Sequence, residues 1–487
     1  MIRDVLKEEI SRIVLELAGG EVDVKITVPE RPENGDYTTN IAFKTGDPEK
    51  IAEELRKCEI IREVFVKNKF INIFVKDEVF LDELQKKAEF PKKREKINLE
   101  FISANPTGPL TMANGRGGFY GDALANVLSK AGYDVTREYY INDAGNQVRL
   151  LGESIEAAEG KREVKEEYYK GEYIKGLVGK SAPEAVSYLL GEIKKSLEKV
   201  GIKFDVWFSE RELREKKEPE QLLKFLEEKK LLEKRDGATW LGDAVLVKSD
   251  GEYTYFLVDL AYHWNKFHDR KFDLAIDIWG ADHHGYVERM KKGIESIGVD
   301  QNQLTIIIMQ LVRLISGGKE VRMSKRAGEF VTMDDLIEDV GVDVARWFFL
   351  ERSPNTHMDF DLDLAKERSE KNPVFYVQYA HTRMASILSK SNLDTRFPSA
   401  FKHASERALA MKILRLPELL ADVSRDFQVQ RLTTYAYELA QIFSAFYRDV
   451  KVIGSEREAE LLYLVSKTKE TLADALTILG ISLPEKM

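Results

Sequence analysis

The sequence predicts a multidomain α/β protein, in which a parallel-sheet domain lies between an α+β N-terminal domain and an all-α C-terminal bundle. Three observations carry this prediction. Strand-like and helix-like segments alternate from Ile97 onward, which is typical of a parallel sheet covered by helices. An amphipathic helix and short strands precede this region. After Asn372 nearly every segment has helical spacing, which indicates a bundle.

The α+β domain is predicted for residues 1–88. We expect an amphipathic helix at Ile2–Leu17, a loop rich in Pro, Gly, Asp and Asn at Pro29–Thr39, and short alternating strands in the run VFVKNKFINIFV,. The basic stretch Pro91–Lys96 is expected to be a solvated linker to the next domain,.

The parallel-sheet domain is predicted for residues 89–333. INLEFIS is its first strand, Gly117–Lys130 has helical spacing, and DVTREYYI is the next strand,. A highly charged helical stretch at about 152–230 interrupts the alternation, so we expect an inserted subdomain. The sheet resumes with DLAIDIWGAD and LTIIIMQLV. Residues 334–370 are then a connecting segment, and 371–487 form the helical bundle.

Composition restricts the class of protein. The chain has 487 residues, of which 43% are hydrophobic, so large cores are possible and wholesale disorder is excluded. We find no apolar run long enough for a membrane span, and the amphipathic start is not a signal peptide. The single cysteine, Cys58, excludes an internal disulfide and a cysteine-rich zinc site,. These features predict a cytoplasmic protein.

The net charge of −9 is unevenly distributed along the chain. Residues 371–487 contain sixteen Lys plus Arg and thirteen Asp plus Glu, whereas the remainder of the chain carries −12. A mildly basic bundle on an acidic protein is the direction expected of a domain that contacts nucleic acid.

Two loops indicate chemistry on phosphates. The run NPTGPLTMANGR leads from the first strand into a helix, whose N-terminus would offer free N–H groups and a positive dipole end to an anion. It is neither GxGxxG nor GxxxxGK[ST], so a dinucleotide fold and a P-loop are not indicated. About two hundred residues later GGKEVRMSKRAG forms a second polar loop, and its lysine could reach the same phosphates.

The two loops resemble the HIGH and KMSKS signatures of class I aminoacyl-tRNA synthetases, in the form found in arginyl-tRNA synthetases. The resemblance spans nearly the whole chain. Further matching blocks are ENGDYTTNIAF, YTYFLVDLAY, WGADHHGYVERM, NPVFYVQYAHTR and the closing GISLPEKM.

The resemblance implies a Rossmann-like catalytic domain and a reaction. L-Arginine would be joined to ATP through the α-phosphate, and the arginyl-adenylate would then pass its arginyl group to the 3′-terminal ribose of tRNA(Arg). ATP would arrive with Mg²⁺, held largely by phosphate and water, and no tightly bound protein metal is expected. We expect a monomer that does not bind membranes.

The resemblance also implies the ATP site. Thr111 and Asn114 stand where the family carries the two HIGH histidines, and both can donate hydrogen bonds although neither can carry a positive charge. They could also simply cap the helix. Arg322 replaces the first lysine of KMSKS, and Lys325 would hold the phosphates. The expected ATP-binding residues are Pro106, Gly108, Gly115, Gly280, Asp282, His283, Met323, Ser324 and Lys325.

Arginine recognition needs carboxylates, because a guanidinium has five donors and no acceptor. Glu100 is an acid within an apolar strand, which is costly to bury without a cationic partner. Asp259 lies on an apolar run one helical turn after Tyr255. The alternatives are an exposed edge-strand position for Glu100 and a structural ion pair for Asp259. The arginine-binding residues that the resemblance implies are Glu100, Ser103, Asn105, Tyr255, Asp259 and His283.

Aromatic and basic residues near the start of the bundle predict contact with unpaired RNA bases. The resemblance places the anticodon there, through Tyr379, His381 and Arg383, and places the outer corner of tRNA on the N-terminal domain, through Asn34 and Tyr37. Tyr376 could instead be a core residue. The neighbouring His283 and His284 lack further ligands at zinc spacing, and we expect His263 and His268 to be structural.

Two other functions stay open. A catalytically silent tRNA-binding paralogue is motivated by Thr111 and Asn114, and it would bind tRNA without forming product. The other is a different class I ligase or a nucleotidyltransferase; a lysine- or cysteine-specific enzyme would not need two acids around the side-chain pocket.

Overall fold

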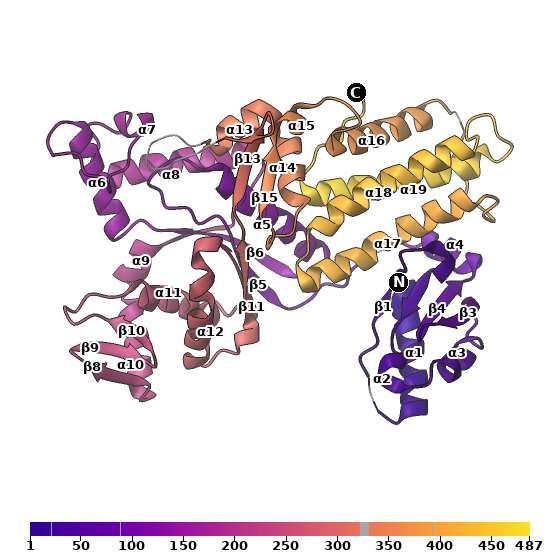
Figure 1. Cartoon of the computed structure of the whole chain (residues 1–487), viewed down its shortest axis with the longest axis horizontal. Coiled ribbons are helices and arrows are strands. Elements are labelled where there is room, and N and C mark those ends of the chain that lie inside the picture. The colour runs from indigo at the N-terminus through magenta and orange to yellow at the C-terminus, as the bar shows by residue number, and fades with distance from the viewer. Residues whose placement is uncertain (21, 88, 322–330, 392) are drawn as a thin grey trace.

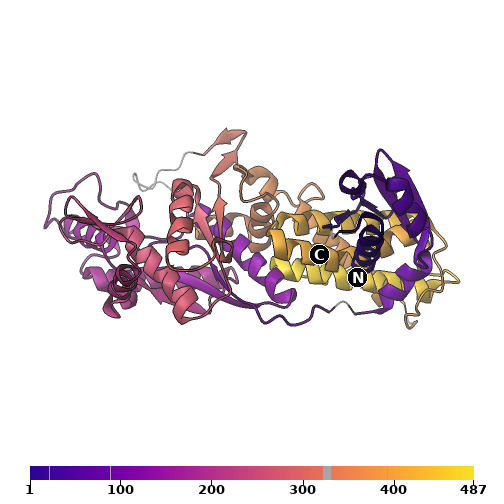
Figure 2. The same cartoon turned by 90° about the horizontal axis from the view of Figure 1, so that it is seen from below.

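The structure is a computed structural model that describes residues 1–20, 22–87, 89–321, 331–391 and 393–487. Figure 1 shows the N-terminal domain beside the C-terminal helices at one end, the parallel sheet in the middle, and the α6–α10 region at the other end. The view turned by 90° shows the same elongated order (Figure 2). Within the described ranges, no helix is both long and apolar enough to cross a membrane.

The N-terminal domain is α+β, as predicted. Its antiparallel sheet has the order β1-β2-β4-β3 and buries its apolar side chains against the first helix and α3. The helices are α1 (Ile2–Ala18), α2 (Ala42–Thr45), α3 (Pro48–Leu55) and α4 (Asp77–Gln85), and the strands are β1 (Ile26–Thr27), β2 (Tyr37–Thr39), β3 (Ile61–Lys67) and β4 (Phe70–Val75).

The central sheet has five parallel strands in the order β12-β11-β5-β6-β7. Its strands are β5 (Lys96–Glu100), β6 (Asp134–Ile141), β7 (Val206–Ser209), β11 (Leu274–Gly280) and β12 (Leu304–Met309). Strand β5 is the first in the chain and lies at the centre of the sheet. The next two strands, β6 and β7, lie on one side of it, and the last two, β11 and β12, lie on the other. The strand order therefore reverses between β5 and β11, and ligands of such sheets bind beyond the carboxyl ends at this point.

Different helices cover the two faces of this sheet. Helix α5 (Met112–Lys130) packs on the face of Ile97 and Leu99, in a core shared with the C-terminal helices. Helices α11 (Tyr255–Trp264) and α12 (Val287–Ser296) cover the opposite face. The approach of α5 requires glycine, because a Cβ on Gly121 would lie 2.3 Å from the ring of Phe101.

The region after β6 differs from the single helical insertion predicted for about 152–230. Strand β7 interrupts its helices after Lys199 and joins the edge of the central sheet, and the region continues past residue 230 into a small antiparallel sheet of order β10-β9-β8. Its elements are α6 (Asn146–Ala158), α7 (Glu172–Lys175), α8 (Ala182–Lys199), α9 (Glu210–Glu215), α10 (Glu218–Glu228), β8 (Leu232–Arg235), β9 (Ala238–Leu241) and β10 (Ala244–Val247).

The rest of the chain connects the sheet to the bundle. Strand β13 (Val312–Ser316) pairs with β14 (Lys319–Glu320) and with β15 (Met358–Asp361). The connecting helices are α13 (Met333–Val340), α14 (Val342–Leu350) and α15 (Leu362–Lys366), and the bundle consists of α16 (Pro373–Ser389), α17 (Ala404–Asp426), α18 (Gln430–Asp449) and α19 (Glu458–Leu479). The all-α prediction for the tail is confirmed.

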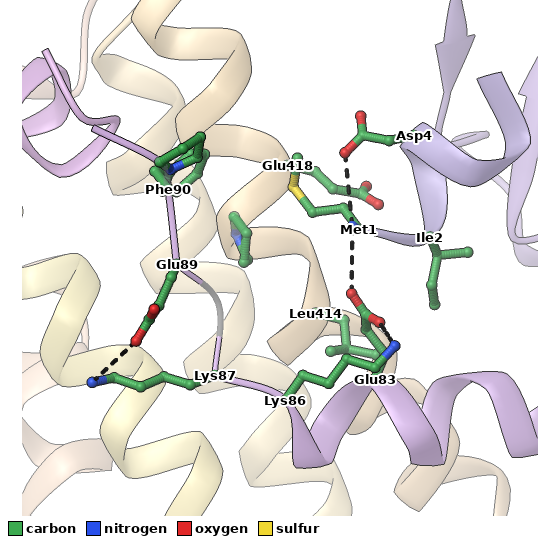
Figure 3. A pocket seen from close by; sticks show the side chains of 12 residues that line it. Met1, Ile2, Asp4, Glu83, Lys86, Lys87, Glu89, Phe90, Leu414 and Glu418 are labelled. Carbon is green, nitrogen blue, oxygen red and sulfur yellow. Dashed lines mark hydrogen bonds and ion pairs between the residues drawn. The ribbon is translucent and has the colours of Figure 1, made fainter. Parts of the chain in front are cut away.

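The N-terminal domain is joined to α17 by ion pairs. Arg407 of α17 donates two hydrogen bonds of 2.8 Å to the carboxylate of Asp36 and one of 2.6 Å to Asp77. A cavity of about 370 Å³ opens at this junction (Figure 3). Inside it the amino group of Met1 lies 3.5 Å from Glu83 and 3.7 Å from Asp4.

Candidate active site

The first signature loop leaves the sheet through a strained backbone. Immediately after β5, Ile102 and Ser103 have φ values of 68° and 40°, which a β-branched residue adopts only where the surroundings impose it. The Ser103 hydroxyl donates to Oε1 of Glu100 at 2.9 Å and accepts from the N–H of Tyr140 at 3.1 Å. The loop is thus fixed to both β5 and β6 at the carboxyl edge.

Thr111 and Asn114 cap helix α5. The N–H of Thr111 donates to Oδ1 of Asn114 at 2.9 Å, and the N–H of Asn114 donates back to Oγ1 of Thr111 at 3.4 Å. This capping box confirms the interpretation of the two residues as caps. The box uses the oxygen of the Asn114 amide, so its nitrogen is the atom through which Asn114 could donate to a phosphate.

The segment that follows the second signature loop is hydrogen-bonded to the start of α5. The N–H of Met112 donates to the carbonyl of Val331 at 3.2 Å, and the N–H of Met333 donates to the carbonyl of Leu110 at 2.9 Å. Thr111 and Thr332 form an antiparallel bridge between these bonds. The downstream anchor of the second loop therefore lies beside the first loop.

Only residues 317–321 of the second loop lie within the described residues. Arg322, Met323, Ser324 and Lys325 lie outside the described residues. Their predicted contacts with ATP stay predictions.

Three acids stand side by side on the sheet face that α11 covers. Asp277 of β11 is in register with Glu100 of β5, and Glu100 is in register with Glu138 of β6. All three are buried. Such a row of like charges is destabilising unless cations neutralise it.

The neutralising cations come from the π-helical turn after α11, Asn265–Asp269, and from the residue that follows it. Lys266 is fully buried, and its Nζ lies 2.7 Å from Glu100 and 2.8 Å from Asp277. Arg270 pairs with Glu138. Burial alone would raise the pKa of Asp277, but Lys266 holds it well below its usual value. Glu100 is thus not an exposed edge-strand residue, and its partner is Lys266.

His263 extends this row toward the predicted arginine pocket. Its Nε2 lies 2.8 Å from Oδ2 of Asp277, and its Nδ1 lies 2.7 Å from the carbonyl oxygen of Asp259. The buried polar groups thus form a continuous chain from the backbone of Asp259 to Glu100. His263 has the structural role that the sequence predicted.

Asp259 differs from the acids of the row. The hydroxyl of Tyr286 donates to its Oδ2 at 2.8 Å, but no described side chain forms an ion pair with it, so it is not a structural ion pair within the described residues. Burial, reinforced by the carboxylates of Glu210 and Glu100, raises its pKa to about 6. Both carboxylates predicted for arginine therefore lie close enough to interact, and Asp259 is the one that lacks a cation.

The other predicted pocket residues differ in exposure. Tyr255 is 59% exposed at the start of α11, beside a cavity of about 980 Å³ that Arg149, Arg214 and Lys248 also line. Asn105 is exposed in the first loop. Of the residues predicted to approach ATP closely, Pro106, Gly108 and Gly115 are buried.

The end of β11 presents exposed polar groups. Gly280, Asp282 and His283 are all exposed at the carboxyl edge, with His283 3.6 Å from Asp282. A Cβ on Gly280 would meet Oδ1 of Asp282 at 2.6 Å, so glycine lets that carboxylate fold back over the strand end. Among the described side chains, no group of three or more His, Cys, Asp and Glu could hold a metal ion.

Two residues predicted to touch tRNA are instead buried, Tyr37 between the N-terminal domain and α17 and His381 within the C-terminal domain. Tyr37 is 2% exposed, and its hydroxyl donates to Glu418 of α17 at 2.7 Å. His381 is also 2% exposed, and its Nδ1 lies 3.1 Å from the carbonyl of Pro484. This burial argues against direct contact of either side chain with RNA, because the same residue types that stack on bases also fill protein interiors.

The remaining predicted RNA contacts have accessible positions. Tyr379 is 51% exposed, and Arg383, one turn later on α16, is exposed with its guanidinium 4.7 Å from the ring centre of Tyr447. Asn34 is partly exposed. Tyr376 packs on Tyr437, which is the core position left open for it.

Four residues of this network were not predicted from the sequence: Lys266, Asp277, Glu138 and Arg270. The available signal was one acid within each of three strand-like runs: Glu100 in INLEF, Glu138 in DVTREYY and Asp277 in LAIDI. Such a pattern demands cations nearby, but only the tertiary structure shows which ones.

The fold and the two joined loops define the catalytic domain of a class I aminoacyl-tRNA synthetase. Three family descriptions match the chain: an arginyl tRNA synthetase N terminal domain at 1–75, the catalytic domain of tRNA synthetases class I (R) at 170–369, and a DALR anticodon binding domain at 377–487. The first signature loop lies between the first two matches.

Relatives cover the whole chain. An arginine–tRNA ligase of Carboxydothermus hydrogenoformans is 40% identical over 96% of this chain and 95% of its own length. One of Bacillus subtilis is 39% identical over 100% and 99%. The arginyl-tRNA synthetase of Thermus thermophilus, 22% identical, shares the fold over the full length of both chains with a TM-score of 0.83. The chain belongs to the arginyl-tRNA synthetase family, whose reaction is the ligation of arginine to tRNA.

Proposed function

We propose that the family's reaction, ATP-dependent ligation of L-arginine to tRNA(Arg), takes place where the start of α5, the end of β5 and helix α11 meet. The observation that carries this proposal is the backbone pairing between Leu110–Met112 and Val331–Met333. It ties the base of the second signature loop to the helix N-terminus of the first. A phosphate at that N-terminus would be within the region that both loops serve.

Asp259 is proposed to bind the guanidinium of arginine. It is a partly buried carboxylate with a raised pKa and no cationic partner among the described residues, and a guanidinium is the cation that matches a carboxylate with two parallel bonds. Glu100 already contacts Lys266, which it shares with Asp277, but a carboxylate can accept about four hydrogen bonds. It can therefore still accept from the amino group or guanidinium of the substrate.

Binding in this pocket would direct the arginine carboxylate toward the α-phosphate of ATP. Attack forms the arginyl-adenylate and releases pyrophosphate, and the 2′-hydroxyl of the terminal tRNA ribose then takes the arginyl group and releases AMP. Such displacements need positioning and charge stabilisation. The positive end of the α5 dipole, Asn114 and, from the second loop, Lys325 would supply them. ATP enters as its Mg²⁺ complex, which is substrate and not a resident metal.

The cavity beside Tyr255 is proposed to admit the 3′ end of tRNA. Arg149, Arg214 and Lys248 line it together with Tyr253 and Tyr255. Cations beside aromatic rings suit a single strand, since the cations face its phosphates and the rings stack on its bases. At the far end of the molecule, Tyr379 and Arg383 are proposed to contact the anticodon.

The experiment is aminoacylation measured against all twenty amino acids, with arginine-dependent ATP–pyrophosphate exchange measured with and without tRNA(Arg). Arginyl-tRNA as the product supports the proposal. Binding of tRNA with neither exchange nor product would favour the silent paralogue, which the loss of both HIGH histidines motivates. Size measurement in solution tests the proposed monomer, and cell fractionation tests the proposed cytoplasmic location.

A further inference from the structure

Two arginines at helix α5 are almost completely buried: Arg116 belongs to the helix, and Arg346 contacts it from α14. Arg346 of α14 is 2% exposed, and its Nη1 donates to Oδ2 of Asp122 at 2.7 Å. Its charge is therefore neutralised by an acid on α5. Arg116 of α5 is 1% exposed, and in the described parts of the chain no carboxylate forms an ion pair with it.

Arg116 is held by backbone carbonyls instead. Its Nη1 donates to Gln310 at 2.6 Å, and its Nη2 donates to Ser353 at 3.0 Å and to Thr356 at 2.9 Å. Burial lowers its pKa to about 10, so it keeps its positive charge at neutral pH. Carbonyl dipoles solvate the guanidinium but do not cancel its charge. A buried charge without a counter-ion is costly, so its retention calls for a use.

The charge lies at the phosphate end of the helix. Gln310 directly follows the last residue of β12, so the guanidinium is at the carboxyl edge of the sheet. Side chains of a helix lean toward its N-terminus, which places the charge of Arg116 near the first turn of α5. Its field therefore adds to the positive end of the helix dipole.

This position has particular value in this chain. Thr111 and Asn114 stand where the two signature histidines would stand, and neither can become positively charged. A second source of positive potential near the phosphates is then useful, and a buried, unneutralised cation acts strongly because few water molecules screen it.

We propose that Arg116 is a positioning residue that supplies positive electrostatic potential to the phosphate-binding end of α5 and thereby tightens ATP binding. This inference rests on the proposed function and adds to it a residue that does not itself touch ATP. Its three carbonyl bonds also tie α5 to the end of β12 and to the connecting segment, so a purely structural role is the competing explanation.

The test compares Arg116→Gln and Arg116→Lys with the matched variants Arg346→Gln and Arg346→Lys. The KM values for ATP and for arginine are measured by tRNA-dependent pyrophosphate exchange, and stability by urea unfolding. Arg116→Gln should raise the KM for ATP about tenfold, as expected for loss of one nearby charge at intermediate dielectric, and leave the KM for arginine within about twofold. Arg346→Gln should lower stability and leave the KM for ATP unchanged.

Arg116→Lys keeps the inference testable if Arg116→Gln does not fold. A buried lysine loses its proton at lower pH than an exposed one, so the KM for ATP of Arg116→Lys should rise as pH increases from about 7 to 9, whereas the parent and Arg346→Lys should show no such rise. A folded Arg116→Gln with parental KM for ATP, equal changes in both KM values, or a pH profile of Arg116→Lys parallel to the parent would each overturn the inference. Absence of exchange in the parent itself would instead reject the proposed function.

Discussion

The ionic network at the domain junction and the one under the predicted arginine pocket differ in whether their charges are matched. At the domain junction, Arg407 donates hydrogen bonds to both carboxylate oxygens of Asp36, and Arg3 donates to Asp422 at 2.6 Å. Every one of these carboxylates faces a cation. Under the predicted arginine pocket, the acid row is matched by Lys266 and Arg270, but the adjoining Asp259 is not matched by any described residue.

The comparison shows how burial can serve two purposes. A saturated network such as the junction fixes two domains relative to each other, because any separation would leave charges buried without partners. A network with one unmatched carboxylate is prepared for a cationic ligand, and its pKa is raised for the same reason. Mutations should therefore affect stability at the first network and substrate use at the second.

The largest effect is expected from Asp259→Asn. Loss of the proposed partner of the guanidinium should lower kcat/KM for arginine about a hundredfold or more, the usual cost of truncating one side of a buried charge pair. Stability should not fall, since an unmatched carboxylate is removed. Pyrophosphate exchange at varied arginine and urea unfolding measure the two effects, and a variant that is destabilised but kinetically normal would contradict the comparison.

Arg407→Met is the opposite case. It leaves the buried carboxylate of Asp36 without its bidentate partner, which should lower the free energy of unfolding by about 3 kcal/mol. Arginine KM should stay at the parental value at temperatures where the variant is folded. Denaturant unfolding followed by circular dichroism provides the measurement. If arginine KM changed as strongly as in Asp259→Asn, the two networks would not be functionally separate.

The raised pKa of Asp259 predicts a pH dependence. Because its pKa of about 6 in the folded protein lies above the ordinary value, ionisation costs stability above pH 6, and this cost disappears as pH falls below 6. Arginine binding needs the ionised form, so arginine KM should rise as pH falls through 6, by about tenfold per unit below it. Asp259→Asn should lack this rise. A parental KM that is flat from pH 7 to 5 would refute the assignment.

The smallest effects are expected on the bundle. Tyr379→Ala should raise the KM for tRNA(Arg) about tenfold, the typical value for loss of one base-stacking ring, and leave stability nearly unchanged because Tyr379 is exposed. His381→Ala should show the reverse, with lower stability and parental KM for tRNA. Aminoacylation at varied tRNA concentration distinguishes the two. Equal tRNA effects would restore His381 as an RNA contact.

Local patterns were enough to predict the domain classes and the chemical needs of the site. The strand, loop and helix around NPTGPLTMANGR follow from apolar periodicity, proline and a capping threonine, all of which act over a few residues. An acid inside the apolar strand of Glu100 requires a cation because desolvation of an isolated carboxylate is costly. These conclusions depend only on neighbours along the chain.

The tertiary structure decided every match between distant residues. Lys266 lies 166 residues from Glu100, and only strand order and register bring the two together. The short strand β7 joins the central sheet through pairing with β6, although the helical segments around it predicted an insertion. Tyr37 and His381 have the side chains of RNA contacts, but α17 and the C-terminal segment bury them. Burial and charge pairing depend on what packs against a residue, and that is a property of the folded chain as a whole.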